Sequence, residues 1–298
     1  MNKKSTRASW IIHDKGSLKL SLAAETFYRS CLKRIGCENL PLTEYQPWMS
    51  SPVFAKIYLE KADYFTITKP QKVLDFDPAF LKGIDKILRC EPSLPILDSD
   101  LKLDIFQEIA TNRKRSVEIY EKSLNLISEW EPWQSKAFFA IIKSIIPISS
   151  GGKNDEDGNA FSDHHMIGAI FTSVEYRSPF PEISLNISFA HELGHQALML
   201  YQNSGDMFFG NDSWVYSGVR KTLRPVVASF HAAVALSYMI ECIRSLLRNS
   251  TEPDKSAFLK VLLDEYRIGL ESGINAIAEL PKSDLCDLIL NDLKLSLN

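Results

Sequence analysis

The chain has 298 residues, of which 45% are hydrophobic and 10% aromatic, and its formal net charge is −3. This composition is typical of a globular protein with a substantial core, and it offers no electrostatic basis for binding nucleic acid or an anionic membrane. We find no apolar run of the roughly 18–20 residues that a membrane span needs. Charged residues follow the first apolar stretch at His13–Lys15, so we expect no signal peptide.

The five cysteines are scattered, odd in number and without C-x-x-C spacing. This pattern favours free thiols in a reducing compartment over a disulfide framework or a zinc ribbon. We therefore expect a soluble cytoplasmic protein.

The first part of the chain is predicted to be mostly helical, from Leu18 to about Trp133, because apolar residues recur at three- and four-residue spacing. The segment Phe138–Ile148 is rich in Ile and Phe, which favours a buried strand, although the pattern also allows a helix. A polar loop follows at Ser149–Gly158, and Met166–Val174 is predicted to be a second short strand.

The remaining elements are predicted to be helices. A long helix is expected over Glu182–Gln202. Another is expected to start at Pro225, since proline suits the first helical position, and to run through Arg248. Asp254–Leu297 has the pattern of two amphipathic helices interrupted at Pro281.

These elements predict an α+β fold that is predominantly helical, with a small sheet next to the long helix over Glu182–Gln202. No linker or internal repeat marks a boundary, so we expect one domain. Its parts would be a mostly helical N-terminal part, a central core and a pair of C-terminal helices, over residues 1–136, 137–250 and 251–298 of the 1–298 chain.

A metal-binding motif lies on the long predicted helix. His191 and His195 are four residues apart in His191-Glu192-Leu193-Gly194-His195, so a helix would place both imidazoles on one face. From there both can reach one ion at about 2.0–2.1 Å, which is why H-E-x-x-H is a metal signature. Ile187 and Leu198 share this face and turn it toward the interior. Two core histidines without a metal would carry heavy desolvation costs, so we favour the metal.

Two histidines do not complete a metal site, and several residues are candidates for the third ligand. His231 stands in an apolar helical segment, where it is as readily a ligand as a lone core histidine. Glu241 and the loop residues Asp206 and Asp212 are alternatives. The pair His164-His165 could supply at most one ligand, because adjacent strand residues point to opposite faces, and an exposed loop end is favoured there.

Arg224 stands seven residues before His231, as Tyr238 stands seven after it. On one helix the three would share a face. An arginine near a metal ligand can hold a carboxylate in a bidentate clamp, although a surface salt bridge at a helix start is the plainer interpretation.

Together these motifs resemble a family of H-E-x-x-H peptide-modification proteins from gene clusters that make ribosomally synthesised, post-translationally modified peptides. The resemblance consists of His191–His195, a loop with Trp214–Tyr216, the step Arg224–Pro225 and then His231. The predicted strand Ile167–Phe171 ahead of the motif is also similar.

The resemblance is specific over about residues 160–245 and implies an iron(II), 2-oxoglutarate-dependent oxygenase. Such an enzyme would hydroxylate a side chain of a precursor peptide at its β-carbon. Ala232 follows His231 where the family usually has glycine, which leaves the shape of the pocket open. The implied site residues are the iron ligands His191, His195 and His231, and Arg224 as the partner of the cosubstrate carboxylate.

The residues alone leave the metal and the reaction open. An all-histidine set departs from the usual two-histidine, one-carboxylate iron site and holds zinc equally well. In an oxygenase Glu192 would orient a ligand or the substrate, whereas in a zinc metallopeptidase it would be the general base. Neither the third histidine of the metzincins nor an E-x-x-x-D segment is present, which counts against the peptidase. A structural metal protein is disfavoured, because such sites usually have four protein ligands.

Overall fold

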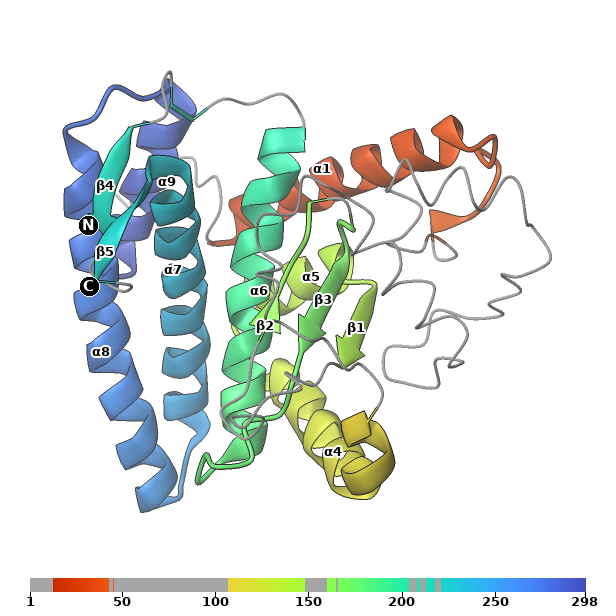
Figure 1. The fold of residues 1–298 in the computed structure, drawn as a ribbon, viewed down its shortest axis with the longest axis vertical. Helices are drawn as coiled ribbons and strands as arrows, with labels where there is room; N and C mark the ends of the chain where they lie inside the picture. Colours follow the sequence, from red (N-terminus) through yellow and green to blue (C-terminus); the bar gives the residue numbers. More distant parts are fainter. Residues whose placement is uncertain are drawn as a thin grey trace, which may run out of the picture. The chain divides into compact units, whose positions relative to one another are not determined.

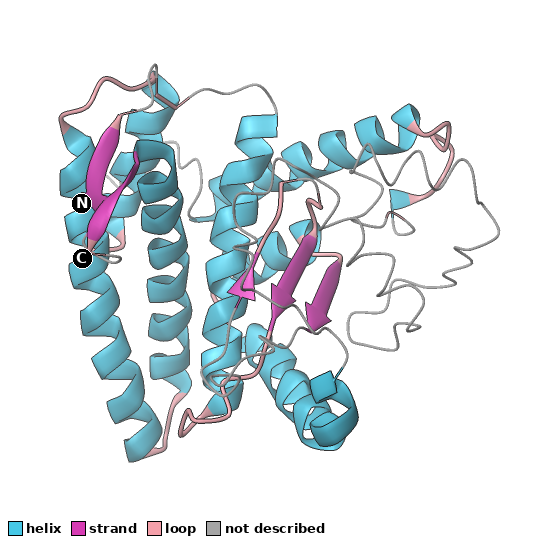
Figure 2. Cartoon of the chain, viewed as in Figure 1, coloured by secondary structure: helices cyan, strands magenta, loops and turns pink. Residues whose placement is uncertain are grey.

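The computed structural model describes residues 13–42, 45, 107–147, 160–164, 166–203, 208–209, 213–217 and 221–298. Within these residues the chain is mostly helical with two small sheets (Figures 1 and 2), which confirms a predominantly helical α+β fold. The helices are α1 (His13–Arg34), α4 (Gln107–Leu126), the short 3-10 helix η4 (Ile127–Glu129), α5 (Pro132–Ile141), α6 (Pro181–Asn203), α7 (Val226–Asn249), α8 (Pro253–Ala278) and α9 (Asp284–Leu295). The strands are β1 (Ser144–Pro147), β2 (Ala160–Phe161), β3 (Ala169–Thr172), β4 (Trp214–Ser217) and β5 (Thr222–Pro225).

The chain divides into two compact units whose segments alternate along the sequence. The first unit contains residues 1–27, 129–141 and 193–298, and the second contains residues 28–128 and 142–192. Both α1 and α6 therefore contribute to each unit. The expectation of one domain over residues 1–298 stays a prediction.

The second unit is built around a three-stranded sheet of order β1-β3-β2. β1 runs parallel to β3, with Ile145 opposite Ile170, and β2 runs antiparallel to it. The central strand β3 is buried along its whole length, as expected of an apolar strand with neighbours on both edges. Phe161 of β2 stacks on its cross-strand partner Phe171 with ring centroids 4.5 Å apart.

Hydrogen bonds join α4 to this sheet and to the start of α6. The Tyr120 hydroxyl donates to the backbone oxygen of Thr172 at 2.7 Å. The Ser123 hydroxyl donates to the backbone oxygen of Glu182 at 2.8 Å, and the Asn186 side chain donates to the backbone oxygen of Ser123 at 2.7 Å. Because these groups are buried or partly buried, each bond offsets a desolvation cost that would otherwise destabilise the unit.

The first unit is organised around α7 and α8, which pack against each other as a helical hairpin (Figure 1). α8 also contacts α9 and β4, and the antiparallel hairpin β4–β5 leads directly into α7. The two C-terminal helices on either side of Pro281 confirm that part of the sequence interpretation.

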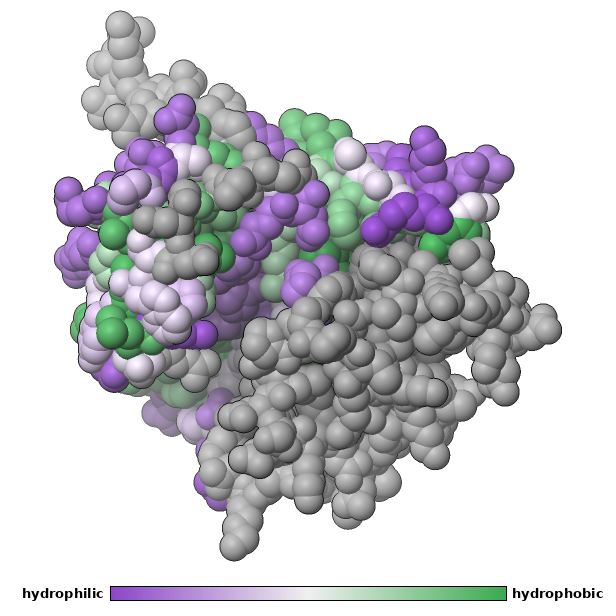
Figure 3. Space-filling view, turned by 45° about the horizontal axis from the view of Figure 1, so that its top comes forward, coloured by the Kyte–Doolittle hydropathy of each residue, from purple (hydrophilic) through white to green (hydrophobic). Residues whose placement is uncertain are grey.

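α7 passes the length and composition test for a membrane span, contrary to our sequence expectation that no such run exists. However, 72% of its most apolar window is buried inside the protein, which is the property of a core helix and is consistent with a soluble protein. On the part of the surface that Figure 3 draws in colour, apolar residues lie in separate patches among polar ones.

Two sequence expectations about secondary structure are wrong in detail. Phe138–Ile148 is not one strand: the helix α5 continues through Ile141, and only Ser144–Pro147 is strand. The buried residues Trp133, Ala137 and Ile141 follow helical spacing, which the run of isoleucines obscured. The second predicted strand shortens to Ala169–Thr172. The polar loop at 149–158 lies outside the described residues.

Candidate metal centre

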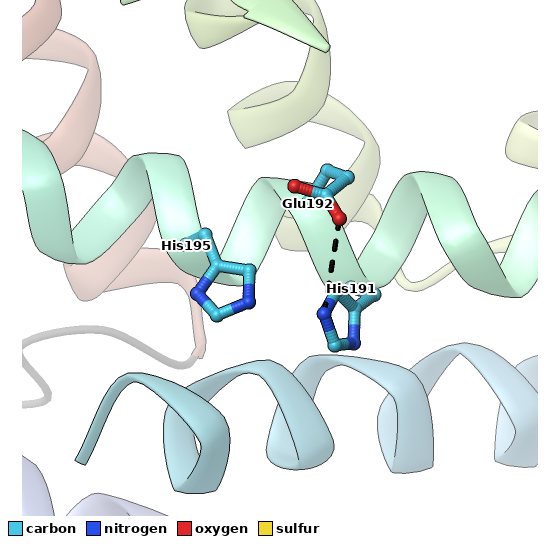
Figure 4. A group of neighbouring side chains, drawn as sticks. All are labelled: His191, Glu192 and His195. Carbon is cyan, nitrogen blue, oxygen red and sulfur yellow. Dashed lines mark ion pairs between the residues drawn. The ribbon is translucent and has the colours of Figure 1, made fainter. Parts of the chain in front are cut away.

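The helix α6 places His191 and His195 on one side and Glu192 on another (Figure 4). One ligand atom from each of the three residues lies within 4.8 Å of the others. Ile187 and Leu198 on the histidine face are buried, whereas the two histidines are half-buried. The helix itself sets this arrangement, because residues four apart lie one turn from each other. The two histidines thus remain partly accessible to solvent, while Ile187 and Leu198 on the same face of α6 pack into the core.

A third imidazole, that of His231 on α7, lies beside His195. The two Nδ1 atoms are 3.3 Å apart. Two nitrogens that share one ion at about 2.0–2.1 Å are roughly 2.9 Å apart at a right angle and roughly 3.4 Å apart at the tetrahedral angle. The observed separation therefore suits either a shared proton or a shared cation.

A glycine explains how α6 and α7 come so close at this point. A Cβ atom on Gly194 would lie 2.8 Å from the Cα of Ala235 and 3.2 Å from its backbone nitrogen. Real Cβ atoms do not approach backbone this closely, so only glycine allows the two helix backbones to approach at this position. Gly194 directly precedes His195, and the close contact brings His195 within reach of α7.

Glu192 is fully buried, and its two carboxylate oxygens have different surroundings. Oε2 accepts a hydrogen bond from the Ser162 hydroxyl at 2.6 Å. Oε1 is buried without a hydrogen-bond partner among the described residues and lies 3.7 Å from Nε2 of His191. Burial raises the pKa of Glu192 to about 8, and the hydrogen bond from Ser162 opposes this shift. A buried oxygen without a partner is what a cation or a polar substrate group would satisfy, so the donor set fits a metal centre.

His231 has a hydrogen-bond partner on each ring nitrogen. Its Nδ1 faces Nδ1 of His195, and its Nε2 lies 3.0 Å from Oε1 of Gln202. Burial lowers the pKa of His231 to about 4, because the charged imidazolium would lose its hydration. The imidazole is therefore neutral at physiological pH, which is the form that ligates metals.

The other ligand candidates from the sequence are less well placed or lie outside the described residues. The Glu241 carboxylate accepts a hydrogen bond from Arg244, with a distance of 3.0 Å between Oε1 and the guanidinium nitrogen. His164 is exposed. The remaining candidates, Asp206, Asp212 and His165, are not among the described residues.

Arg224 does not share a helix face with His231 and Tyr238, so that expectation is wrong. It lies on β5 opposite Val215, because the chain stays extended until Pro225 and α7 begins only at Val226. Extended backbone before a proline is the expected conformation. The segment expected to be a Trp- and Tyr-containing loop is the strand β4.

Sequence reasoning missed two residues of this arrangement. Gln202 follows His195 by seven residues, so both lie on one face of α6, and this spacing was a signal that could have been used. Ser162 lies 30 residues before Glu192, and no local pattern connects the two. No protein-family model and no curated protein matches the chain.

Proposed function

We propose that this protein is a metal-dependent peptide-modifying enzyme. Its activity would be that of an iron(II), 2-oxoglutarate-dependent oxygenase that hydroxylates a side chain of a ribosomally made precursor peptide. The metal would be held by His191, His195 and His231. The single observation that supports a metal centre with these ligands is the 3.3 Å separation between Nδ1 of His195 and Nδ1 of His231, beside the H-E-x-x-H pair.

Three nitrogen ligands favour a catalytic centre over a structural one. Structural zinc sites are usually closed by four protein ligands, whereas catalytic sites keep positions open for water, substrate or cosubstrate. A bound iron(II) ion would supply redox chemistry with dioxygen, and a bound zinc ion would supply Lewis acidity. The three histidines would hold the ion. Glu192, which accepts a hydrogen bond from Ser162, would supply a polar group beside them.

The choice of iron(II), 2-oxoglutarate and a peptide substrate rests on the sequence resemblance around residues 160–245. Arg224 as the partner of the cosubstrate carboxylate stays a prediction from the same source. The protein would act in the cytoplasm, in keeping with the free thiols of Cys31, Cys37, Cys242 and Cys286.

A zinc metallopeptidase is the second candidate, and one observation favours it. Oε1 of Glu192 is buried, without a hydrogen-bond partner among the described residues, and 3.7 Å from His191. Once deprotonated, a carboxylate oxygen in that position can act as a general base. The hydrogen bond that holds Oε2 on Ser162 favours an orienting role instead.

Two parallel assays test the proposal. Protein reconstituted with iron(II) under anaerobic conditions is given dioxygen, 2-oxoglutarate and any small peptide that a neighbouring gene encodes. We expect succinate release and a peptide mass increase of one oxygen atom. Protein loaded with zinc is given the same peptide, and cleavage there without succinate in the first assay would overturn the oxygenase in favour of the peptidase.

The variant Glu192→Gln separates the two roles of the carboxylate. It should retain partial activity in an oxygenase, where Glu192 orients its neighbours, and lose nearly all activity in a peptidase, where it moves a proton. His164→Ala is the matched control, because it removes an exposed histidine that is not part of the proposed centre.

A further inference from the structure

We propose that Gln202 is a positioning residue that sets the tautomer of His231 and so directs the Nδ1 lone pair of that ring toward His195. The effect of Gln202 on metal binding rests on the proposed metal centre. The tautomer itself is a property of the metal-free protein.

The geometry at the His231 ring carries this inference. A neutral imidazole has one N–H donor and one acceptor nitrogen. Nε2 of His231 lies 3.0 Å from Oε1 of Gln202, and an amide oxygen can only accept. Nε2 must therefore carry the hydrogen, and Nδ1 must carry the lone pair.

The Nδ1 lone pair of His231 then faces His195, where the proposed metal site needs a third ligand. Nδ1 of His231 lies 3.3 Å from Nδ1 of His195. In the metal-free protein Nδ1–H of His195 can donate to it. A cation can take the place of this hydrogen once the proton of the His195 ring has moved from Nδ1 to Nε2, which leaves both Nδ1 atoms with a lone pair. The opposite tautomer would present an N–H to the ion and abolish ligation by this nitrogen. A hydrogen bond from the second ring nitrogen to a carbonyl or carboxylate is the usual way in which proteins orient histidine ligands.

α6 supplies both neighbours of the ring. His195 and Gln202 are two turns apart on one face of this helix, and each contacts a different nitrogen of His231. The adjacent amide cannot do the same, because Asn203 is exposed and its side chain donates to the backbone oxygen of Met199 at 3.0 Å. Asn203 is therefore a matched control for Gln202.

The first test measures the tautomer directly in metal-free protein labelled with ¹⁵N-histidine. Nuclear magnetic resonance distinguishes a protonated from an unprotonated ring nitrogen. We expect hydrogen on Nε2 of His231 in the wild type, in Gln202→Glu, which keeps an acceptor, and in Asn203→Ala. In Gln202→Met the population with hydrogen on Nδ1 should rise. Hydrogen on Nδ1 in the wild type overturns the inference, and this measurement needs no variant to fold.

The second test measures the affinity for cobalt(II), used as a spectroscopic probe. Gln202→Met should weaken binding about 10–100-fold, in the range seen when the partner of a ligating histidine is removed. Gln202→Glu and Asn203→Ala should both bind cobalt with close to the wild-type affinity. Equal affinity in Gln202→Met and the wild type overturns the positioning role. If wild-type protein binds no cobalt, the proposed function fails, while the tautomer measurement still decides the role of Gln202.

Discussion

At the scale of single residues, the pair Ser162 and Glu192 shows how a carboxylate is kept in the interior. Glu192 is fully buried on α6, and the Ser162 hydroxyl is the one hydrogen-bond donor to its carboxylate among the contacts resolved in the described residues. A carboxylate without compensating hydrogen bonds is costly to bury, and the raised pKa of Glu192 reflects that cost. The stability of this pair can be tested apart from any activity.

Replacement of Ser162 by alanine should destabilise the metal-free protein by about 1–3 kcal/mol, since a buried acceptor loses its donor. Urea denaturation measures the free energy of unfolding. Ser128→Ala is the control, because Ser128 is exposed and, among the described residues, its hydroxyl donates only to the nearby backbone oxygen of Asn125. Its expected effect is within about 0.5 kcal/mol. Equal losses in both variants would mean that the hydrogen bond to Glu192 does not stabilise the fold.

Buried thiols should make the protein less stable at alkaline pH. Burial raises the pKa of the Cys242 thiol well above its usual value of 9.0. Above pH 9 the unfolded thiol therefore ionises while the folded one stays neutral, so its contribution to stability is complete below pH 9 and falls as pH rises toward the folded pKa. In Cys242→Ala the slope of unfolding free energy between pH 9 and 10.5 should be shallower by up to about 1.4 kcal/mol per pH unit.

The matched control for this pH effect is Ile240→Val, which changes the core of the same helix without removing a titratable group. Its slope should equal that of the wild type. The measurement is urea denaturation at a series of pH values, and the same slope in Cys242→Ala and the wild type would refute the explanation.

At the scale of helices and strands, the approach of α6 to α7 is the feature on which the candidate centre depends. Gly194 permits the approach, which brings His195 of α6 next to His231 of α7. Glycine inside a helix lowers stability by roughly 0.5–1 kcal/mol relative to alanine. The close packing that Gly194 allows offsets this loss. The hairpin β4–β5 determines where α7 begins, because β5 ends at Pro225.

Gly194→Ala should cost about 1–3 kcal/mol of unfolding free energy, because its Cβ would meet the backbone of Ala235 and force the helices apart. Cobalt(II) affinity should fall as His195 moves away from His231. Gly273→Ala is the control on α8, since its Cβ would meet Ala233 at an ordinary 3.5 Å. That variant should gain up to about 1 kcal/mol from helix propensity. A stabilising Gly194→Ala would show that the close approach is not needed.

At the scale of the whole molecule, a bound ion should stabilise the fold, because a ligand that binds only the native state shifts the unfolding equilibrium. At a free metal concentration 100 times the dissociation constant, the expected gain is about 2.7 kcal/mol. It should appear as a higher melting temperature by calorimetry that a chelator reverses. His231→Ala should lose this gain, and His164→Ala should keep it. Stoichiometric metal retained in His231→Ala would rule out His231 as a principal ligand.

The sequence by itself determined the features that depend on local periodicity. The helices α6, α8 and α9 and the common face of His191 and His195 follow from spacings of three and four residues. Where two local patterns competed, the interpretation was wrong, as at Phe138–Ile148, where a helix and a short strand share one apolar run. The strand at Trp214–Ser217 was missed because its pairing with β5 is not visible in its own few residues.

The tertiary structure alone decided which distant side chains meet. Of the candidates for a third ligand that the structure describes, only His231 is brought to within 3.3 Å of a motif histidine, and this depends on the approach of two helices at Gly194. The contacts of Ser162 with Glu192 and of Gln202 with His231 likewise join residues about thirty positions apart. Spacing along the chain specifies which residues share a helix face, whereas packing between elements specifies what that face meets, and the chemistry of His191 and His195 depends on both.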